Sequence, residues 1–182
     1  MTALRALALI LLAAPAAAED PGWDQAGRAL ELRAHARLMA LDRSLPAQFE
    51  SDGCSGGLSA AWSAAAGALP VFARAHREVP PFEPCCVIHD RAYHAAGGAG
   101  TAEESYAARL AADRDLRHCV LETGVQRQGE LAALYGVRGA QVDAAYQHLA
   151  RSVYYAVRFG GAPCSGLSWR WGFGFGPCRS GN

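Results

Sequence analysis

Three common features are missing from this 182-residue sequence: lysine, a net charge and a Cys-x-x-Cys pair. Its 17 acidic residues balance 17 basic ones, all of them arginine, so no global positive field favours nucleic acid as a partner. The missing Cys-x-x-Cys pair argues against a structural zinc site. Beyond residue 18 no apolar run is long enough to cross a membrane, so we expect no transmembrane segment in the rest of the chain.

Residues 1–18 have the composition of a secretory signal peptide. Arg5 precedes an apolar run over residues 6–14, and residues 16–18 are all alanine. A run of this length is too short to span a bilayer comfortably, and small residues at its end favour cleavage over a retained anchor, which is the alternative. We therefore expect a mature chain of residues 19–182 that is secreted or periplasmic.

All cysteines of the chain lie in that mature part. An even number of cysteines in an exported protein predicts disulfides, up to three of them here. Free or metal-binding cysteines are the alternative, but the neighbours Cys85 and Cys86 would crowd one tetrahedral zinc ion. The residues alone leave the pairing open. The six are Cys54, Cys85, Cys86, Cys119, Cys164 and Cys178.

Apolar periodicity, proline and glycine predict a mainly α-helical fold in a single domain, without repeats or linkers. Pro70 is expected to close one of the helices. Thr101 and Glu104, three residues apart, have the spacing of a capping box at the start of another. The expected helices cover residues 24–44, 58–69, 102–121 and 139–155, and a further one begins near Pro84.

The most informative motif is the stretch Cys-Cys-Val-Ile-His-Asp-Arg-Ala-Tyr, which follows Pro84 directly. In a helix, residues four apart share a face, so His89 and Tyr93 lie on one side with the first cysteine. Asp90 lies on the neighbouring stripe with the second cysteine. The motif therefore predicts an imidazole and a carboxylate side by side on a helix that disulfides can hold in place, as a polar site requires.

The next predicted helix carries a partner for this motif. Asp113 precedes Cys119 by six residues. If Cys119 is bonded to either cysteine of the motif, the two helices lie side by side. Asp113 can then reach the imidazole of His89, and such a pair fixes the tautomer and stabilises the imidazolium that forms in a reaction.

Asp90 points elsewhere, because consecutive helical side chains diverge by about 100°. It is therefore available to bind a cation. A Gly/Ser-rich turn surrounds Cys54, and a disulfide to the motif helix would bring that turn close. Its carbonyls at Gly53, Ser55 and Gly57 can then turn toward calcium, a hard ion that prefers oxygen ligands. The alternative is an ordinary surface loop.

The last segment, residues 160–178, differs from the rest. Its aromatic residues alternate with arginine or glycine at period two, which predicts an extended or irregular segment. Tryptophan beside arginine suits the headgroup boundary of a membrane. The alternative is that the rings pack on the helices as a lid over the core. The aromatic residues are Trp169, Trp171, Phe173 and Phe175.

The Cys-Cys-x-x-His-Asp-x-x-Tyr motif resembles the active-site helix of the secreted phospholipase A2 superfamily. The spacing of Asp113 and Cys119 is also that of the superfamily, and the Ser-Asp-Gly-Cys-Ser wording at residues 51–55 is closer to its bacterial and fungal members. The resemblance implies a disulfide-linked core of two antiparallel helices, within residues 52–121, with additional helices around it.

By this resemblance, His89 is the general base that activates a water, and Tyr93 and Asp113 hold its ring. Asp90 and the loop carbonyls of Gly53, Ser55 and Gly57 bind calcium. The implied disulfides are Cys54–Cys86, Cys85–Cys119 and Cys164–Cys178.

The function that the resemblance implies is calcium-dependent hydrolysis of the sn-2 ester of glycerophospholipids at a phospholipid membrane surface. The alternative is a non-catalytic module of the same fold, which uses calcium for structure and binds lipid or protein. A zinc-dependent hydrolase is not favoured, because the sequence has no His-x-x-x-His or His-Glu pair.

Overall fold

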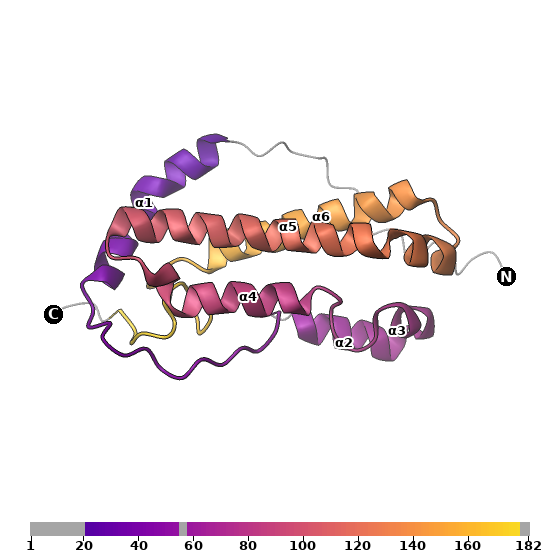
Figure 1. The fold of residues 1–182 in the computed structure, drawn as a ribbon, viewed down its shortest axis with the longest axis horizontal. Coiled ribbons are helices and arrows are strands. Elements are labelled where there is room, and N and C mark those ends of the chain that lie inside the picture. The colour runs from indigo at the N-terminus through magenta and orange to yellow at the C-terminus, as the bar shows by residue number, and fades with distance from the viewer. Residues whose placement is uncertain (1–20, 55–57, 179–182) are drawn as a thin grey trace.

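The computed structural model describes residues 21–54 and 58–178. The expected signal segment, residues 1–18, lies outside the described residues, and so do Ser55 and Gly57. The described part is mainly α-helical and contains no strand (Figure 1). Its elements are α1 (Pro21–Met39), α2 (Leu58–Ala68), α3 (Pro70–His76), α4 (Glu83–His94), the short 3-10 helix η3 (Ala96–Gly98), α5 (Ala102–Tyr135) and α6 (Gly139–Gly160).

The two longest helices form the spine of the molecule. α5 and α6 lie along each other, and the turn at Gly136 reverses the chain between them (Figure 1). Gly136 has a φ of 64°, a left-handed conformation that glycine adopts without the strain of a side chain. The capping box at the start of α5 is confirmed, because Thr101 and Glu104 each accept a hydrogen bond from the other's backbone N–H.

α5 is longer than predicted and ends at Tyr135 rather than at residue 121. Its extension contains Gly124, which by itself disfavours a helix. A Cβ at Gly124 would lie 2.4 Å from Cγ of Tyr146 on α6, so the glycine allows the two helices to approach closely. Packing against α6 therefore outweighs the weak helix propensity of this stretch.

Pro70 begins a helix as well as following one. α2 ends at Ala68, and Pro70 is the first residue of α3. Proline suits this position because its missing N–H would have no intrahelical partner in the first turn. α2 and α3 pack together beyond the start of α4, where the Trp62 ring meets Phe82 edge-on.

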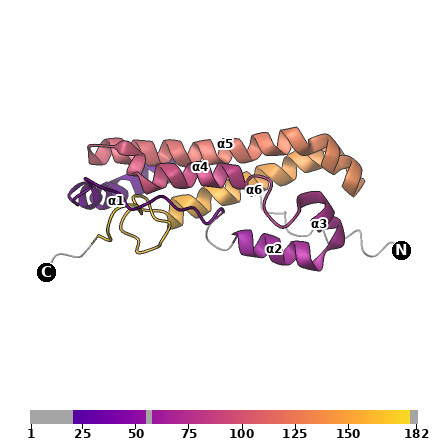
Figure 2. The ribbon, with the colours of Figure 1, turned by 60° about the horizontal axis from the view of Figure 1, so that its bottom comes forward.

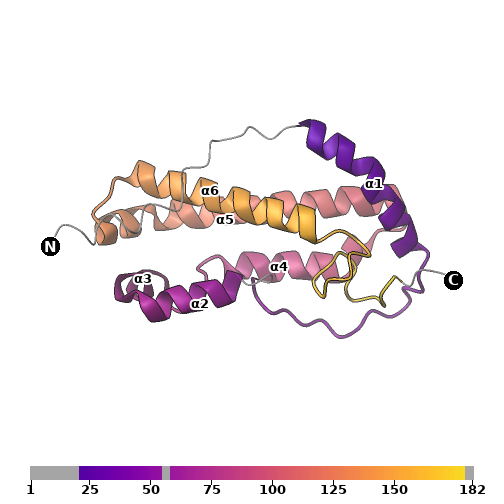
Figure 3. The same ribbon diagram turned by 180° about the vertical axis from the view of Figure 1, so that it is seen from behind.

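α1 lies across the first half of α5 (Figures 1 and 3). It ends at Met39, earlier than the predicted end at residue 44. His35 and Leu38 face inward and are buried. α1 therefore contributes one face to the core near the C-terminal end of α4.

Three disulfides hold these elements together. One joins α4 to α5, one joins α4 to the segment before α2 (residues 40–54), and one closes the C-terminal segment. They are, in that order, Cys85–Cys119, Cys54–Cys86 and Cys164–Cys178. Three disulfides are typical of proteins that fold in an oxidising compartment outside the cytoplasm.

Two hydrophobic clusters form the core, and α4 contributes to both. The larger one includes Phe82, Val120 and Tyr146, and the smaller one surrounds Tyr93 and Trp171. The residues in the middle of α4 are therefore fixed by packing at both ends of the helix. None of the described helices combines the length and the apolar character that spanning a membrane requires.

The aromatic C-terminal segment forms turns rather than a strand and lies beside α4 (Figure 2). Trp171 has no exposed surface, and its ring packs edge-on against Tyr93 with 4.9 Å between the centroids. Phe175 is also buried. The expectation of a membrane-facing surface is therefore wrong for these two rings, which pack on the core instead. Trp169 and Phe173 keep part of their surface exposed.

Candidate functional site

The polar residues of α4 divide between two sides of the helix. His89 and Tyr93 contact α5, and Asp90 contacts the segment before α2. All three are buried. α4 begins with Glu83 and Pro84, which suit a first helical turn through the helix dipole and the fixed φ of proline. The helix thus presents an imidazole and a carboxylate in different directions, as the spacing predicted.

Asp113 of α5 joins His89 and Tyr93 in a hydrogen-bonded cluster. His89 Nε2 lies 2.9 Å from Asp113 Oδ1, and the Tyr93 hydroxyl donates to the same oxygen over 2.7 Å. The Asp113 side chain has no exposed surface. The structure therefore brings together the three residues for which a catalytic role was predicted.

The ionisation of Asp113 decides which ring nitrogen of His89 carries a hydrogen. Burial alone raises the pKa of Asp113, but the hydrogen bond from His89 and the charge of Arg109 outweigh it and hold the pKa below its ordinary value. An ionised carboxylate only accepts hydrogen bonds, so Nε2 of His89 carries the hydrogen. Nδ1 then has the lone pair that a general base needs, and no other described residue bonds to it.

Two arginines, Arg109 fully buried and Arg158 largely buried, extend this cluster, and the sequence did not predict them. Arg158 of α6 donates to Asp113 Oδ2 over 3.1 Å and to Glu31 of α1 over 3.0 Å. Arg109 of α5 donates to the Tyr93 hydroxyl over 3.1 Å and pairs with Glu31. Glu31 and Arg158 are 127 positions apart in the chain, so no local pattern could have linked them.

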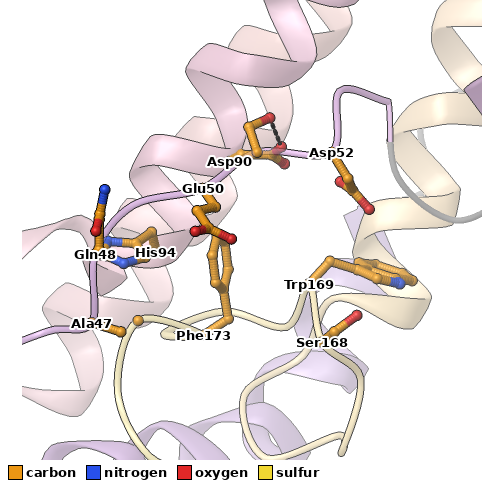
Figure 4. A pocket seen from close by; sticks show the side chains of 11 residues that line it. Ala47, Gln48, Glu50, Asp52, Asp90, His94, Ser168, Trp169 and Phe173 are labelled. Atoms are coloured by element: carbon orange, nitrogen blue, oxygen red, sulfur yellow. Dashed lines mark hydrogen bonds between the residues drawn. The ribbon is translucent and has the colours of Figure 1, made fainter.

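On its other side, α4 borders a pocket of about 340 Å³. Asp90 lines it from the helix, and Glu50 and Asp52 line it from the segment before α2 (Figure 4). Trp169 and Phe173 of the C-terminal segment form part of the opposite wall. The pocket therefore combines three carboxyl groups with two aromatic rings.

Without a cation nearby, the surroundings of Asp90 disfavour its ionised form. Burial raises its pKa, and the hydrogen bond from Ser51 and the neighbouring His89 offset this only in part. The negative charge of Asp52 raises the pKa further. The Ser51 hydroxyl donates to Asp90 Oδ2 over 2.6 Å. A bound cation would remove the cost of ionising this group.

The expected metal loop is described only in part. The N–H of Gly53 donates to the Ser51 hydroxyl over 3.2 Å, and that hydroxyl donates in turn to Asp90. Gly53 has a φ of 76°, which favours glycine. Ser55 and Gly57 lie outside the described residues, so their carbonyls as calcium ligands stay a prediction.

The donor atoms near Asp90 are oxygens, which fit a hard cation such as calcium. They come from Asp90, Asp52 and Ser51, with the backbone of Gly53 next to them. Within residues 21–54 and 58–178, no group of three or more His, Cys, Asp and Glu side chains is arranged to hold a metal ion. A calcium site here would therefore depend on backbone carbonyls and on one or two carboxylates.

Some residues that line the pocket were not predicted from the sequence. Glu50 and Asp52 stand immediately before the predicted metal turn, and acidic residues in that position were a signal. His94, one turn beyond Asp90, lines the pocket as well, and its Nε2 is buried without a hydrogen-bond partner in the described part.

No protein-family model matches the chain, and no curated protein or solved structure matches it either. What bears on function is therefore the geometry of the site. His89 has a fixed tautomer and a buried carboxylate behind it. Its neighbour Asp90 lines an acidic pocket on the adjacent face of the same helix.

Proposed function

We propose that the chain is a secreted or periplasmic, calcium-dependent hydrolase of the phospholipase A2 type, which cleaves the sn-2 ester of glycerophospholipids. The observation that carries this proposal is the pair of neighbours on α4. His89 is bonded to buried Asp113 on one side, and Asp90 lines the pocket on the other. A general base beside a cation site is sufficient for hydrolysing an ester with water, without an acyl-enzyme.

The proposed core consists of α4 and α5 as two antiparallel helices of the phospholipase A2 type. The order of their contacts supports this. Cys85 is bonded to Cys119, while Tyr93, further along α4, contacts Asp113 and Arg109. Residue numbers rise along α4 as they fall along α5, which is the order that antiparallel helices require.

In the proposed reaction, Nδ1 of His89 takes a proton from a water molecule as that water attacks the ester carbonyl. Asp113 accepts the Nε2 hydrogen and stabilises the positive charge that the ring acquires. Tyr93 donates to Asp113 and fixes the carboxylate. A calcium ion held by Asp90 and nearby oxygens would supply the Lewis acid for the carbonyl and its developing negative charge.

Vesicle hydrolysis tests the proposal directly. The purified protein should release free fatty acid from phosphatidylcholine vesicles with calcium, and a chelator should stop the release. His89→Gln should lower the rate by about 10²–10⁴-fold, the usual contribution of a general base. His118→Gln is the matched control and should leave the rate unchanged, because the His118 side chain is 72% exposed on α5.

The alternative is a non-catalytic, calcium-stabilised module that binds lipid or protein. If the folded wild-type protein releases no fatty acid at millimolar calcium, the proposed hydrolase fails and this alternative replaces it. The module would still show calcium-dependent thermal stabilisation or vesicle binding.

For the hydrolase, the position of the acyl chain left on the lysophospholipid distinguishes sn-2 from sn-1 cleavage.

A further inference from the structure

We propose that α1 contributes to this site through Glu31, and that Glu31 and Arg158 of α6 are positioning residues for Asp113. The inference rests on the proposed function, in which Asp113 orients His89. It concerns how a helix outside the α4–α5 pair controls the orienting carboxylate. Figure 3 shows α1 and α6 on the same side of α5.

The two oxygens of Asp113 have separate tasks. Oδ1 accepts from both His89 Nε2 and the Tyr93 hydroxyl. Oδ2 accepts from Arg158 over 3.1 Å. A carboxylate held at both oxygens cannot rotate about its terminal bond without losing a charged hydrogen bond. Arg158 therefore fixes the plane of the carboxylate to which His89 is bonded.

Arg158 is itself held by α1. Its second terminal nitrogen lies 3.0 Å from Glu31 Oε2, so one planar guanidinium bridges Asp113 and Glu31. The other oxygen of Glu31 pairs with Arg109, whose Nε donates to the Tyr93 hydroxyl. Both arginines that act on Asp113 from behind, Arg158 directly and Arg109 through Tyr93, are thus paired with Glu31, and Arg109 also donates to two backbone carbonyls of α6.

The charges of this cluster balance inside the protein. Asp113 and Arg109 side chains have no exposed surface, and those of Arg158 and Glu31 are 9% and 13% exposed. Two carboxylates therefore face two guanidinium groups almost without water. Without Glu31, two buried positive charges would face one carboxylate, next to the ring that becomes positive in the reaction.

Two other titratable groups against the cluster, Tyr93 and His35, are neutral. Burial and the charge of Asp113 raise the pKa of Tyr93 well above its ordinary value. Burial, with the charges of Arg109 and Arg158, lowers the pKa of His35 on α1 to about 3. Among the described side chains of α1, Glu31 therefore offsets the two arginines.

A double-mutant cycle distinguishes positioning from mere structural support. With a soluble monomeric ester at saturating calcium, Arg158→Met should lower kcat about tenfold and leave KM within about twofold, as loss of a transition-state interaction does. Arg158→Lys keeps one donor and should recover about threefold. In an Asp113→Asn background, Arg158→Met should cost less than about twofold, because residues that act through one another are not additive.

Glu31→Gln is the second variant, since it keeps the shape of the side chain and removes only its charge. It should lower kcat about threefold or more and be non-additive with Arg158→Met. Arg151→Met is the control on the same helix, two turns away, because Arg151 pairs with no carboxylate among the described residues. It should leave kcat unchanged. Equal losses of kcat in the wild-type and Asp113→Asn backgrounds would overturn the inference.

A readout without catalysis separates this inference from the proposed function. The His89 Nε2–H resonance in a nitrogen-labelled sample should sit at low field in the wild type. It should shift in Arg158→Met and in Glu31→Gln, in the direction seen with Asp113→Asn. If the wild-type protein hydrolyses nothing but this resonance shifts, the proposed function fails and the positioning role stands. A resonance that Arg158→Met leaves unmoved refutes the positioning role, whether or not the protein is active.

Discussion

The two sides of α4 differ in how their charges are balanced. Behind His89, every oxygen of Asp113 and Glu31 accepts a hydrogen bond from a buried donor. Around Asp90, three carboxyl groups share one pocket. A buried network in which charges are paired stabilises and orders its members, whereas carboxylates gathered without a cation repel one another. The first side holds a fixed geometry, and the second concentrates negative charge at one pocket.

The largest expected difference between the two sides concerns a pair of tryptophans. Trp171 packs behind Tyr93 with no exposed surface, and Trp171→Ala should cost about 3–5 kcal/mol in the free energy of unfolding. Trp169 lies at the pocket and is partly exposed, so Trp169→Ala should cost about 1–2 kcal/mol.

Urea unfolding measures both values, and vesicle hydrolysis adds a second comparison. Trp169→Ala should reduce activity on vesicles while hydrolysis of a soluble ester stays unchanged. If both variants lose the same stability, or if Trp169→Ala reduces both activities equally, the contrast between a packed and an interfacial ring is wrong.

The disulfides provide a second comparison, with similar stability but different consequences. Cys54–Cys86 and Cys85–Cys119 span 32 and 34 residues, so replacing either pair with serine should cost about 3–4 kcal/mol from loop closure alone. Loss of the first should weaken calcium-induced stabilisation, because that bond holds the turn at Gly53. Loss of the second should reduce kcat more strongly than it reduces calcium binding.

Thermal unfolding with a calcium titration, beside kinetics on a soluble ester, checks this division. If both double variants lose calcium-induced stabilisation and kcat in the same ratio, the disulfides support the fold as a whole and not separate sides of α4.

Calcium itself should act on the Asp90 side. At a calcium concentration 100 times the dissociation constant, binding should stabilise the wild-type protein by about 2.7 kcal/mol. Asp90→Asn should abolish that gain, while Asp115→Asn, on an exposed position of α5, should keep it. Calorimetry with calcium and with chelator gives the result, and a full calcium response in Asp90→Asn would place the ion elsewhere.

The smallest expected effect is that, without calcium, the ionised forms of Asp113 and Asp90 contribute to stability with opposite sign. The pKa of Asp113 is lowered, so its ionisation adds stability above the unfolded value near 3.9, and this is lost as pH falls through the folded pKa. The pKa of Asp90 is raised, so the stability associated with its protonated form is present below about 3.9 and lost as pH rises through the folded pKa.

In chelator at pH 7, Asp90→Asn should therefore raise the free energy of unfolding, and Asp113→Asn should lower it. Both differences should shrink toward pH 3. Urea unfolding across this range measures them, and a destabilised Asp90→Asn protein at pH 7 would contradict the assignment of Asp90 as a cation-dependent carboxylate.

The parts of the site that the sequence predicted are those set by short spacings. The four-residue repeat of the motif positions His89 and Tyr93 on one face, and the interval from Asp113 to Cys119 brings the carboxylate to the same level. The capping box at Thr101 is equally local. Each depends on helix geometry, which a few residues determine.

The rest depended on contacts between distant segments. The pairing of Glu31 with Arg158 joins α1 to α6, and the extension of α5 depends on Gly124 fitting against Tyr146. In the C-terminal segment, the alternation of aromatic residues did not show which rings would be buried. That depends on the surface that α1, α4 and α5 offer to Trp171, which only the folded chain defines.

Neighbouring cysteines on α4 also bear on how the protein acquires its native fold. Exchange of one position with the other gives Cys54–Cys85 and Cys86–Cys119 in place of the native bonds. Consecutive helical residues point about 100° apart, so the exchanged bonds require α4 to turn by about that angle on its axis. The turn carries the imidazole away from its carboxylate. Oxidative refolding should therefore form this isomer in competition with the native one, and a thiol–disulfide isomerase, rather than an oxidant alone, should raise the yield of natively paired protein.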